Sequence, residues 1–232
     1  EQKYIQGDIH KVIKTLKTNS IDFIYTDPPF AITDAKWDKG LNWEELFPEM
    51  FRVLKTKGII ALYASMPFTY ELISTPVKYK YMKPKYHYTW EKNNSTGFFS
   101  AKYQPLRNNE EIFIYYKKAG TYNPQMVGNE FYQKREVVYG GKNKYWGENK
   151  NKDNKYTNEG GHKGRFPKTI QKWKIRKDDT GITRCDDQID YFIKTYTNEG
   201  DTILDMTCCN KYVGNRANKL KRNYIGIDLN IV

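Results

Sequence analysis

The chain has 232 residues, of which 38% are hydrophobic, and carries a formal net charge of +12 at pH 7. This length supports one sizeable core, so we expect a single domain with room for an inserted lobe. No apolar run approaches the roughly 18 residues of a membrane span, and no signal-like apolar stretch opens the sequence. We therefore expect no membrane partner and a cytoplasmic protein, or one of the nucleoid or a viral factory, that is not secreted.

Three cysteines are present, Cys185 and the adjacent pair Cys208 and Cys209. They match neither an even disulfide framework nor the spacing of a zinc site, and a disulfide between immediate neighbours would be strained. We expect reduced thiols and no metal site.

The positive charge is combined with 16% aromatic residues. This pairing suits a surface that meets phosphates and unstacked bases. A lysine-rich composition of the source organism would produce the same charge, so both explanations stay open.

The first third of the chain predicts alternating strands and helices. A short strand at Tyr4-Ile5 leads into Gly7-Asp8, and the apolar run at 21–26 predicts a buried strand that ends before a double proline. Apolar residues at helical spacing predict a helix over 42–54, with Asn42 as its N-cap and Gly58 just past its end. The run at 59–63 is the next strand, and this order is typical of a parallel sheet with helices on both faces.

The middle of the chain predicts two strands, at 86–90 and 111–116, with a polar loop between them. The pattern changes from 121 to 179, where glycine, asparagine and lysine dominate and the segment 142–155 shows no hydrophobic periodicity. Most of the excess positive charge lies in this lobe. It is either a nucleic-acid-facing lobe that orders on binding or a solvated insertion.

The last fifty residues again predict helices and strands. Helices are expected from about 187 to 197 and from 212 to 221, and strands at 202–204 and 223–227. The two strands end at Asp205 and Asp228.

The segment Asp27-Pro28-Pro29-Phe30 follows the buried strand and suits one kind of chemistry. An exocyclic amine on a base is a poor nucleophile, and hydrogen-bond acceptors held against it free its lone pair. The Asp27 carboxylate and the Pro28 carbonyl would be those acceptors, stiffened by the prolines, and Phe30 would stack on a base that has left its duplex. The alternative is a rigid turn at the end of a strand.

Many separated motifs give the chain its resemblance to a known family. It resembles the DNA adenine-N6 and cytosine-N4 methyltransferases of the permuted group, in which the catalytic loop precedes the cofactor loop. The matching segments run over nearly the whole chain: Gly7-Asp8, Thr26 to Phe30, Lys36-Trp37-Asp38, Thr96-Gly97-Phe98, Pro105-Leu106-Arg107, Tyr122 to Gln125, Arg165 to Lys168 and Thr195 to Gly200. The loop begins with an aspartate, and in this it resembles the adenine-N6 branch, since cytosine-N4 enzymes usually carry serine at that position.

This resemblance implies a fold and a division of the chain. The fold would be α/β, a Rossmann-like sheet of the S-adenosylmethionine-dependent methyltransferases in circularly permuted order, with an irregular basic target-recognition insertion. Residues 1–120 would form the catalytic half, 121–179 the basic recognition lobe, and 180–232 the cofactor-binding half of the same domain. The strand that ends at Asp8 would lie beside those that end at Asp228 and Asp205.

The resemblance also implies ligands and partners. S-adenosyl-L-methionine would be the cofactor, held by Asp8, Asp27, Asp205, Thr207, Asp228 and Arg184. DNA would be bound by Lys36, Trp37, Lys102, Arg107, Arg165 and Lys168. Further partners would be a second copy of the chain, or a restriction or specificity subunit of a restriction-modification system. Any of the aspartates that end a strand could instead cap a helix.

The chain departs from the family on the cofactor side. After Asp205, where the family has a glycine-rich loop, Cys209 and Lys211 occupy the two glycine positions. The segment 180–185 replaces a His-Pro-Thr-Gln-Lys-Pro-like segment and keeps only the positive charge, as Arg184. Three readings follow: an active adenine-N6 enzyme, a degenerate homologue that serves as a DNA-binding or partner subunit, and a cytosine-N4 or RNA methyltransferase.

Overall fold

The computed structural model describes residues 1–78, 83–133, 135–138, 142–143, 147–148, 155–158, 161–178 and 181–231. The chain divides into two compact units. The main unit comprises Glu1–Asn123 and Lys168–Val232, and the second unit comprises Pro124–Pro167. Each unit is described by itself below.

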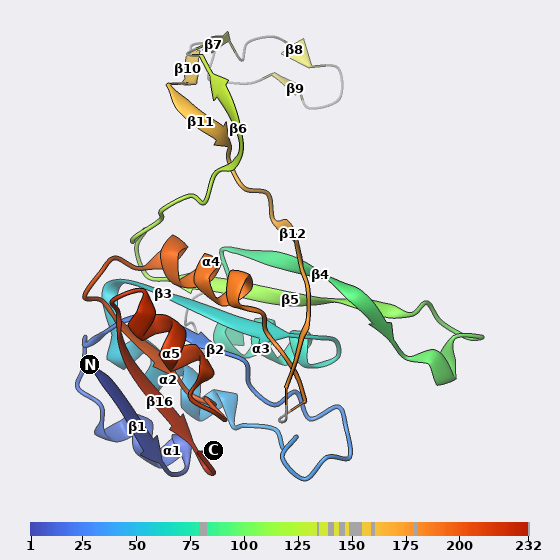
Figure 1. The fold of residues 1–232 in the computed structure, drawn as a ribbon, viewed down its shortest axis with the longest axis vertical. Coiled ribbons are helices and arrows are strands. Elements are labelled where there is room, and N and C mark those ends of the chain that lie inside the picture. The colour runs from blue at the N-terminus through green and yellow to red at the C-terminus, as the bar shows by residue number, and fades with distance from the viewer. Residues whose placement is uncertain are drawn as a thin grey trace. The chain divides into compact units, whose positions relative to one another are not determined.

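The main unit is built on an eight-stranded sheet (Figure 1). Its strands, in spatial order, are β1 (Gln2–Gln6), β16 (Asn223–Asp228), β15 (Thr202–Asp205), β2 (Ile21–Thr26), β3 (Leu54–Ala64), β5 (Arg107–Tyr116), β4 (Tyr86–Thr96) and β12 (Ile170–Trp173). All neighbouring pairs are parallel except the two that involve β5. The predicted α/β class is confirmed, and so is the predicted order at one edge, where β1, β16 and β15 lie side by side.

Helices cover both faces of this sheet (Figure 1). Helices α1 (Ile9–Thr15), α2 (Trp43–Val53) and α3 (Phe68–Lys78) pack into one hydrophobic core, and α4 (Asp186–Tyr196) and α5 (Tyr212–Lys219) pack into the other. Strand β2 serves both cores because its side chains alternate, with Ile24 in the first core and Phe23 and Tyr25 in the second. A strand buried on both faces reads as the continuous apolar run seen in the sequence.

Helix α2 begins where the sequence predicts. The side chain of Asn42 caps it by accepting a hydrogen bond from the Glu45 amide. Its predicted C-terminal signal is wrong, because β3 starts at Leu54 and Gly58 lies inside that strand. A Cβ at Gly58 would come within 2.6 Å of the Leu54 side chain, so close packing explains this glycine.

Helices α1 and α3 are absent from the sequence prediction. Helix α1 has only seven residues and buries only Ile9 and Ile13, one turn apart. Helix α3 contains Pro76 and several β-branched residues, which weaken its local helical signal. Both helices are held by packing on the sheet.

The second unit consists of short antiparallel pairs. Strand β6 (Val127–Tyr132) pairs with β11 (His162–Arg165), β7 (Arg135–Val138) with β10 (Lys155–Asn158), and β8 (Lys142–Asn143) with β9 (Gly147–Glu148). Much of the segment 142–155 lies outside the described residues. This unit is narrower than the lobe predicted over 121–179, because β12 pairs with β4 in the main sheet. The hairpin of β13 (Arg176–Asp178) and β14 (Gly181–Thr183) belongs to the main unit as well.

No helix within the described ranges is long and apolar enough to cross a membrane.

Candidate active site

Four acidic residues gather along one edge of the main sheet. Strands β15 and β16 end at Asp205 and Asp228, Asp27 directly follows β2, and Asp8 lies two residues beyond β1. These four strands are neighbours, so their carboxyl ends form one continuous edge. Open α/β sheets bind their ligands at this edge.

Asp27 makes an ion pair with a residue from the far end of the chain. Its Oδ2 lies 2.6 Å from Nη2 of Arg184, and the same nitrogen lies 2.8 Å from Oε2 of Glu110 on β5. Although 42% of the Asp27 side chain is exposed, the surrounding protein raises the pKa of its carboxyl to about 6, chiefly by displacing water. Arg184 opposes this rise and Glu110 adds to it. The carboxylate therefore depends on Arg184 for its charge.

The Arg184 guanidinium is enclosed by aromatic rings. Its central carbon lies 4.3 Å from the ring centroid of Tyr63 and 4.8 Å from that of Trp90. Burial disfavours the charged guanidinium, but Asp27 and Glu110 outweigh it, and the pKa of Arg184 is raised. Both distances lie within the range of cation–π attraction, which adds to the ion pairs in holding the group.

A network of hydroxyl groups links the ends of β2 and β15. Thr26 Oγ1 donates to Oδ1 of the buried Asp205 at 2.9 Å, and Thr207 Oγ1 donates to the main-chain carbonyl of Asp27 at 3.1 Å. The Tyr224 hydroxyl donates to the other Asp205 oxygen at 3.1 Å. Burial raises the pKa of Asp205 to about 7, although these hydrogen bonds lower it. Asp205 is thus a buried acceptor whose hydrogen bonds link its own strand, β15, to β2 and β16.

Phe30 packs partly into both cores. Its ring stacks on Phe68 of α3, with centroids 5.3 Å apart and planes 20° apart. Phe30 keeps a half-exposed side chain. Its role as a platform for a base stays a prediction, with Phe68 as the support behind it.

The loop after Phe30 is organised by Asp38. This buried carboxylate accepts hydrogen bonds from the amides of Ala31, Ile32 and Thr33, at 2.7 to 3.0 Å, and from the Thr33 hydroxyl. Burial raises the pKa of Asp38, but these hydrogen bonds outweigh it and leave the pKa below its usual value. The backbone of Ala31 is left-handed, with φ of 55°. Asp38 therefore fixes the turn by which the chain leaves the segment Asp27 to Phe30.

The loop 206–211 contains no glycine, although the family has glycines at positions 209 and 211. Cys209 adopts the left-handed φ of 52° that a glycine would take without strain, whereas Lys211 has an ordinary φ of −81°. Cys208 is buried, and burial raises the pKa of its thiol. The loop is thus able to make a glycine-type turn at Cys209.

The remaining two acidic residues hold backbone amides. The Asp228 carboxylate accepts from the amides of Cys209 at 2.8 Å and Asn230 at 3.1 Å. Asp8 caps α1 by accepting from the His10 amide at 2.9 Å, and its hydrogen bonds with His10 lower the pKa of its carboxyl. Both residues stay predicted cofactor contacts. Their observed hydrogen bonds are also those of capping carboxylates.

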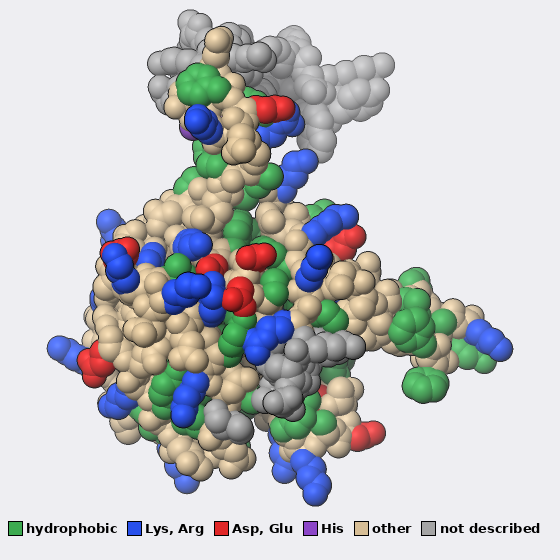
Figure 2. Space-filling view, viewed as in Figure 1, with side chains coloured by type: hydrophobic (Ala, Val, Ile, Leu, Met, Phe, Trp, Pro, Cys, Tyr) green, Lys and Arg blue, Asp and Glu red, His purple; other side chains and the backbone are tan. Residues whose placement is uncertain are grey.

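The predicted DNA-binding residues all have exposed side chains. Lys36, Trp37, Lys102, Arg107 and Lys168 belong to the main unit, and Arg165 belongs to the second unit. Trp37 is 74% exposed. The end of the β4–β5 hairpin, around the short 3₁₀ helix η1 (Phe98–Ser100), also exposes Phe98, Phe99 and Tyr103, which the sequence reading passed over. Figure 2 shows hydrophobic side chains grouped on this hairpin end.

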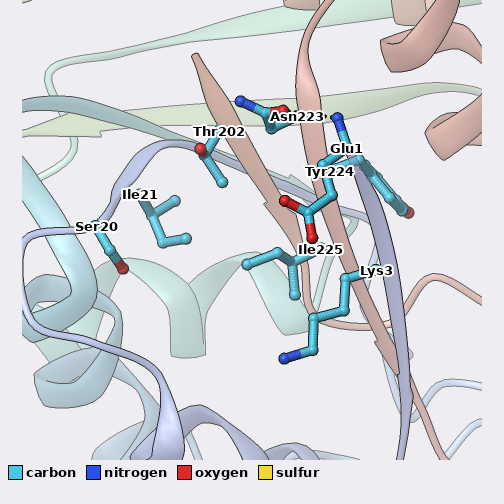
Figure 3. A pocket seen from close by; sticks show the side chains of 8 residues that line it. All are labelled: Glu1, Lys3, Ser20, Ile21, Thr202, Asn223, Tyr224 and Ile225. Atoms are coloured by element: carbon cyan, nitrogen blue, oxygen red, sulfur yellow. Dashed lines mark hydrogen bonds between the residues drawn. The ribbon is translucent and has the colours of Figure 1, made fainter. Parts of the chain in front are cut away.

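A pocket lies at the opposite edge of the sheet (Figure 3). Its lining comes from the starts of β1, β2, β15 and β16, and consists of Glu1, Lys3, Ser20, Ile21, Thr202, Asn223, Tyr224 and Ile225. None of the predicted catalytic or cofactor residues lines it, so it plays no part in the site. Among the described residues, no cluster of three or more His, Cys, Asp or Glu could hold a metal ion.

Sequence reasoning missed three residues of the site, Tyr63, Trp90 and Glu110, and also the role of Asp38 in fixing its loop. Tyr63 and Trp90 read as ordinary apolar strand residues. Glu110 stands beside a second glutamate, Glu111, and no spacing singles it out. Only the pairing of β3, β5 and β4 shows which side chains face Arg184.

The sheet order and the site together define an α/β protein with a Rossmann-like fold and an acidic loop at the ligand edge. A family model described as DNA methylase matches residues 21–231, and the chain belongs to this family of N6/N4 DNA methyltransferases. The predicted family is thereby confirmed.

Similar proteins span nearly the whole chain. The type II methyltransferase M.HpaI of Haemophilus parainfluenzae is 25% identical over 244 residues, which cover 99% of this chain and 71% of that protein. Among solved structures, the complex of M1.HpyAVI with SAM has a TM-score of 0.64 and 19% identity, covering 99% of this chain and 94% of that one. The cytosine-N4-specific PvuII DNA methyltransferase has a TM-score of 0.66 and 12% identity, covering 99% and 82%. The structural similarities concern the fold.

Proposed function

We propose that this chain transfers a methyl group from S-adenosylmethionine to N6 of an adenine that has flipped out of DNA. The observation that carries the proposal is the position of Asp27 at the carboxyl end of β2. Its carboxylate is partly open to solvent, and Thr207 of the cofactor loop donates to its main-chain carbonyl at 3.1 Å. The two loops that the reaction needs are therefore in contact.

The residues at the sheet edge fit the cofactor. Cys209 supplies the left-handed turn of the missing glycine, and a Cβ at Gly226 would come within 3.0 Å of Cys208 Sγ, so the backbone approaches closely there. Asp228 and Asp8 would hold the ribose hydroxyls and the adenine end. When bound, S-adenosylmethionine supplies a methyl group activated on a sulfonium.

The chain's own groups would activate the amine. Asp27 and the Pro28 carbonyl accept hydrogen bonds from the two amine protons, which draws the lone pair out of the ring and towards the methyl group. The prolines hold both acceptors in place before the base enters, and Phe30, backed by Phe68, stacks on the base. No covalent enzyme intermediate is needed. Lys36, Trp37, Lys102, Arg107, Arg165 and Lys168 would contact the DNA, with a homodimer or a restriction or specificity subunit as further partner.

The proposal has two alternatives. The first is a homologue that binds DNA but transfers no methyl group, which is favoured by Cys209 and Lys211 at the two positions where the family has glycine. The second is a cytosine-N4 or RNA methyltransferase. The fold that this chain shares with the cytosine-N4-specific PvuII enzyme is compatible with a cytosine-N4 product. An RNA methyltransferase would differ only in its substrate pocket.

Two measurements test the proposal. Calorimetric titration with S-adenosylmethionine should give saturable heat, and an absence of heat at high micromolar cofactor would favour the DNA-binding homologue. Labelled methyl transfer to DNA should yield N6-methyladenine on nucleoside digestion and should vanish in Asp27→Ala. N4-methylcytosine, or transfer to RNA alone, would select the third reading. Transfer retained in Asp27→Ala would mean that another loop is catalytic.

A further inference from the structure

We propose that Arg184 is a positioning residue for Asp27, which holds Oδ2 of the carboxylate so that Oδ1 is left to accept from the amine of the target base. This inference rests on the proposed function. It assigns Arg184 to the catalytic loop in place of the cofactor contact that the family resemblance implies.

The geometry separates the two oxygens of Asp27. Oδ2 lies 2.6 Å from Arg184 Nη2, and 42% of the Asp27 side chain is exposed, so the carboxylate is held through one oxygen while part of it stays open. A carboxylate with one oxygen held has a fixed rotamer and presents the other oxygen in one direction. The amine needs an acceptor in one direction, because the methyl group must arrive along the lone pair that this hydrogen bond exposes.

Arg184 is itself held on several sides. Its side chain is only 12% exposed, Tyr63 and Trp90 flank the guanidinium, and Glu110 takes the same nitrogen at 2.8 Å. Lys92 makes an ion pair with the other carboxylate oxygen of Glu110, Oε1. A planar guanidinium fits between aromatic rings, and an ammonium does not. A lysine at position 184 would therefore keep the positive charge but would no longer hold the Asp27 carboxylate in the same position.

The charges make Arg184 necessary for the ionised form of Asp27. The charged and titratable groups that act on this carboxylate are Arg184, Glu110 on β5, Lys92 on β4, Tyr25 on β2, Tyr63 on β3 and Asp205 on β15. Without Arg184, Glu110 would repel Asp27 across the gap. The carboxyl would take up a proton and become a donor where the amine requires an acceptor.

The test compares Arg184→Met and Arg184→Lys with a matched control, Arg216→Met. Arg216 is similarly buried, with 14% of its side chain exposed, and pairs with Asp186 and Asp190 on α4, away from Asp27. The titration of the Asp27 carboxyl carbon is followed by ¹³C NMR, with Asp27→Asn for assignment, in parallel with the pH profile of methyl transfer. Arg184→Met should raise the pKa of Asp27 by about 1 unit or more. Arg184→Lys should leave this pKa nearer that of the unaltered protein, and Arg216→Met should leave it unchanged.

In the enzyme assay, Arg184→Lys should lower kcat about 10-fold or more with KM for DNA unchanged, because the acceptor is charged but misplaced. In Arg184→Met the acid limb of the kcat profile should also move to higher pH. An unchanged Asp27 titration in Arg184→Met, or full kcat in Arg184→Lys, overturns the inference. If Arg184→Met does not fold, Glu110→Gln decides the charge argument, since it should lower the pKa of Asp27, and an unchanged value contradicts it. Failure of the proposed function is separate, because it appears as no transfer by the unaltered chain.

Discussion

Thr207 donates a hydrogen bond through Oγ1 to the main-chain carbonyl of Asp27, at 3.1 Å. This bond joins the loop after β15 to the loop after β2. We expect Thr207→Val, which keeps the shape and removes the hydroxyl, to lower the free energy of unfolding by about 1 kcal/mol. It should lower the rate of methyl transfer as well, because the two loops would no longer be held in a fixed relative position. Urea unfolding and a methyl-transfer assay measure these effects. Thr202→Val, at the start of β15, is the control, and equal losses in both variants would show that the bond has no special role.

Asp38 should be needed for the turn that follows Asp27 to Phe30, the proposed catalytic loop. Asp38→Asn removes the charge that three amides and one hydroxyl share, so we expect it to lower the free energy of unfolding by about 2 kcal/mol. The pKa of Asp38 is lowered on folding, so its contribution is complete above the unfolded pKa of about 3.9 and is lost as pH falls through the folded pKa. Urea unfolding from pH 7 down to acid would reveal this. Asp34→Asn, an exposed change in the same loop, should have little effect.

Placing glycine in the loop 206–211, the proposed cofactor loop, should have opposite effects on stability at Cys209 and at Lys211. Cys209→Gly should raise the free energy of unfolding by about 1 kcal/mol, because φ of 52° strains any residue with a Cβ. Lys211→Gly should lower it, since φ of −81° gives glycine no advantage and the unfolded chain gains freedom. Urea unfolding measures both. A loss of stability in Cys209→Gly would mean that the thiol makes a contact worth more than the strain.

The pH dependence of stability should carry a signature of Asp205. Its pKa is raised on folding to about 7, so the native state binds a proton more tightly than the unfolded chain does. The stability that this proton contributes is present below about pH 4 and is lost as pH rises through 7. Asp205→Asn should therefore flatten the fall in the free energy of unfolding between pH 4 and 8. Asp187→Asn on the exposed face of α4 should leave the slope intact, and an unaltered slope in Asp205→Asn would place the titration elsewhere.

DNA binding should depend steeply on salt. A chain with a net charge of +12 that neutralises phosphates releases counterions, so its affinity falls as salt concentration rises. Lys102→Ala should reduce the slope of log affinity against log salt by about 1, if Lys102 contacts one phosphate. Lys221→Ala, which removes an exposed charge paired with Glu199 just before β16, is the control. A flat salt profile in the unaltered chain would show that its charge is not used on DNA.

Local pattern was sufficient for the strongest elements of the fold. The buried run at 21–26 and the capped helix after Asn42 both form where expected, because each carries its own periodicity and end signal. Helix α1 and helix α3 were missed because their residues become helical only against the sheet.

The sequence by itself determined the family and predicted the catalytic loop, since Asp27 to Phe30 follow one another in the chain and need no partner to be recognised. Only the tertiary structure decided what faces that loop. Arg184 reaches Asp27 from 157 positions along the chain, and Glu110 and Trp90 come from two further strands. The physical reason is that charge and ring contacts act over a few ångströms in space, and the order of strands in the sheet brings these residues within that range.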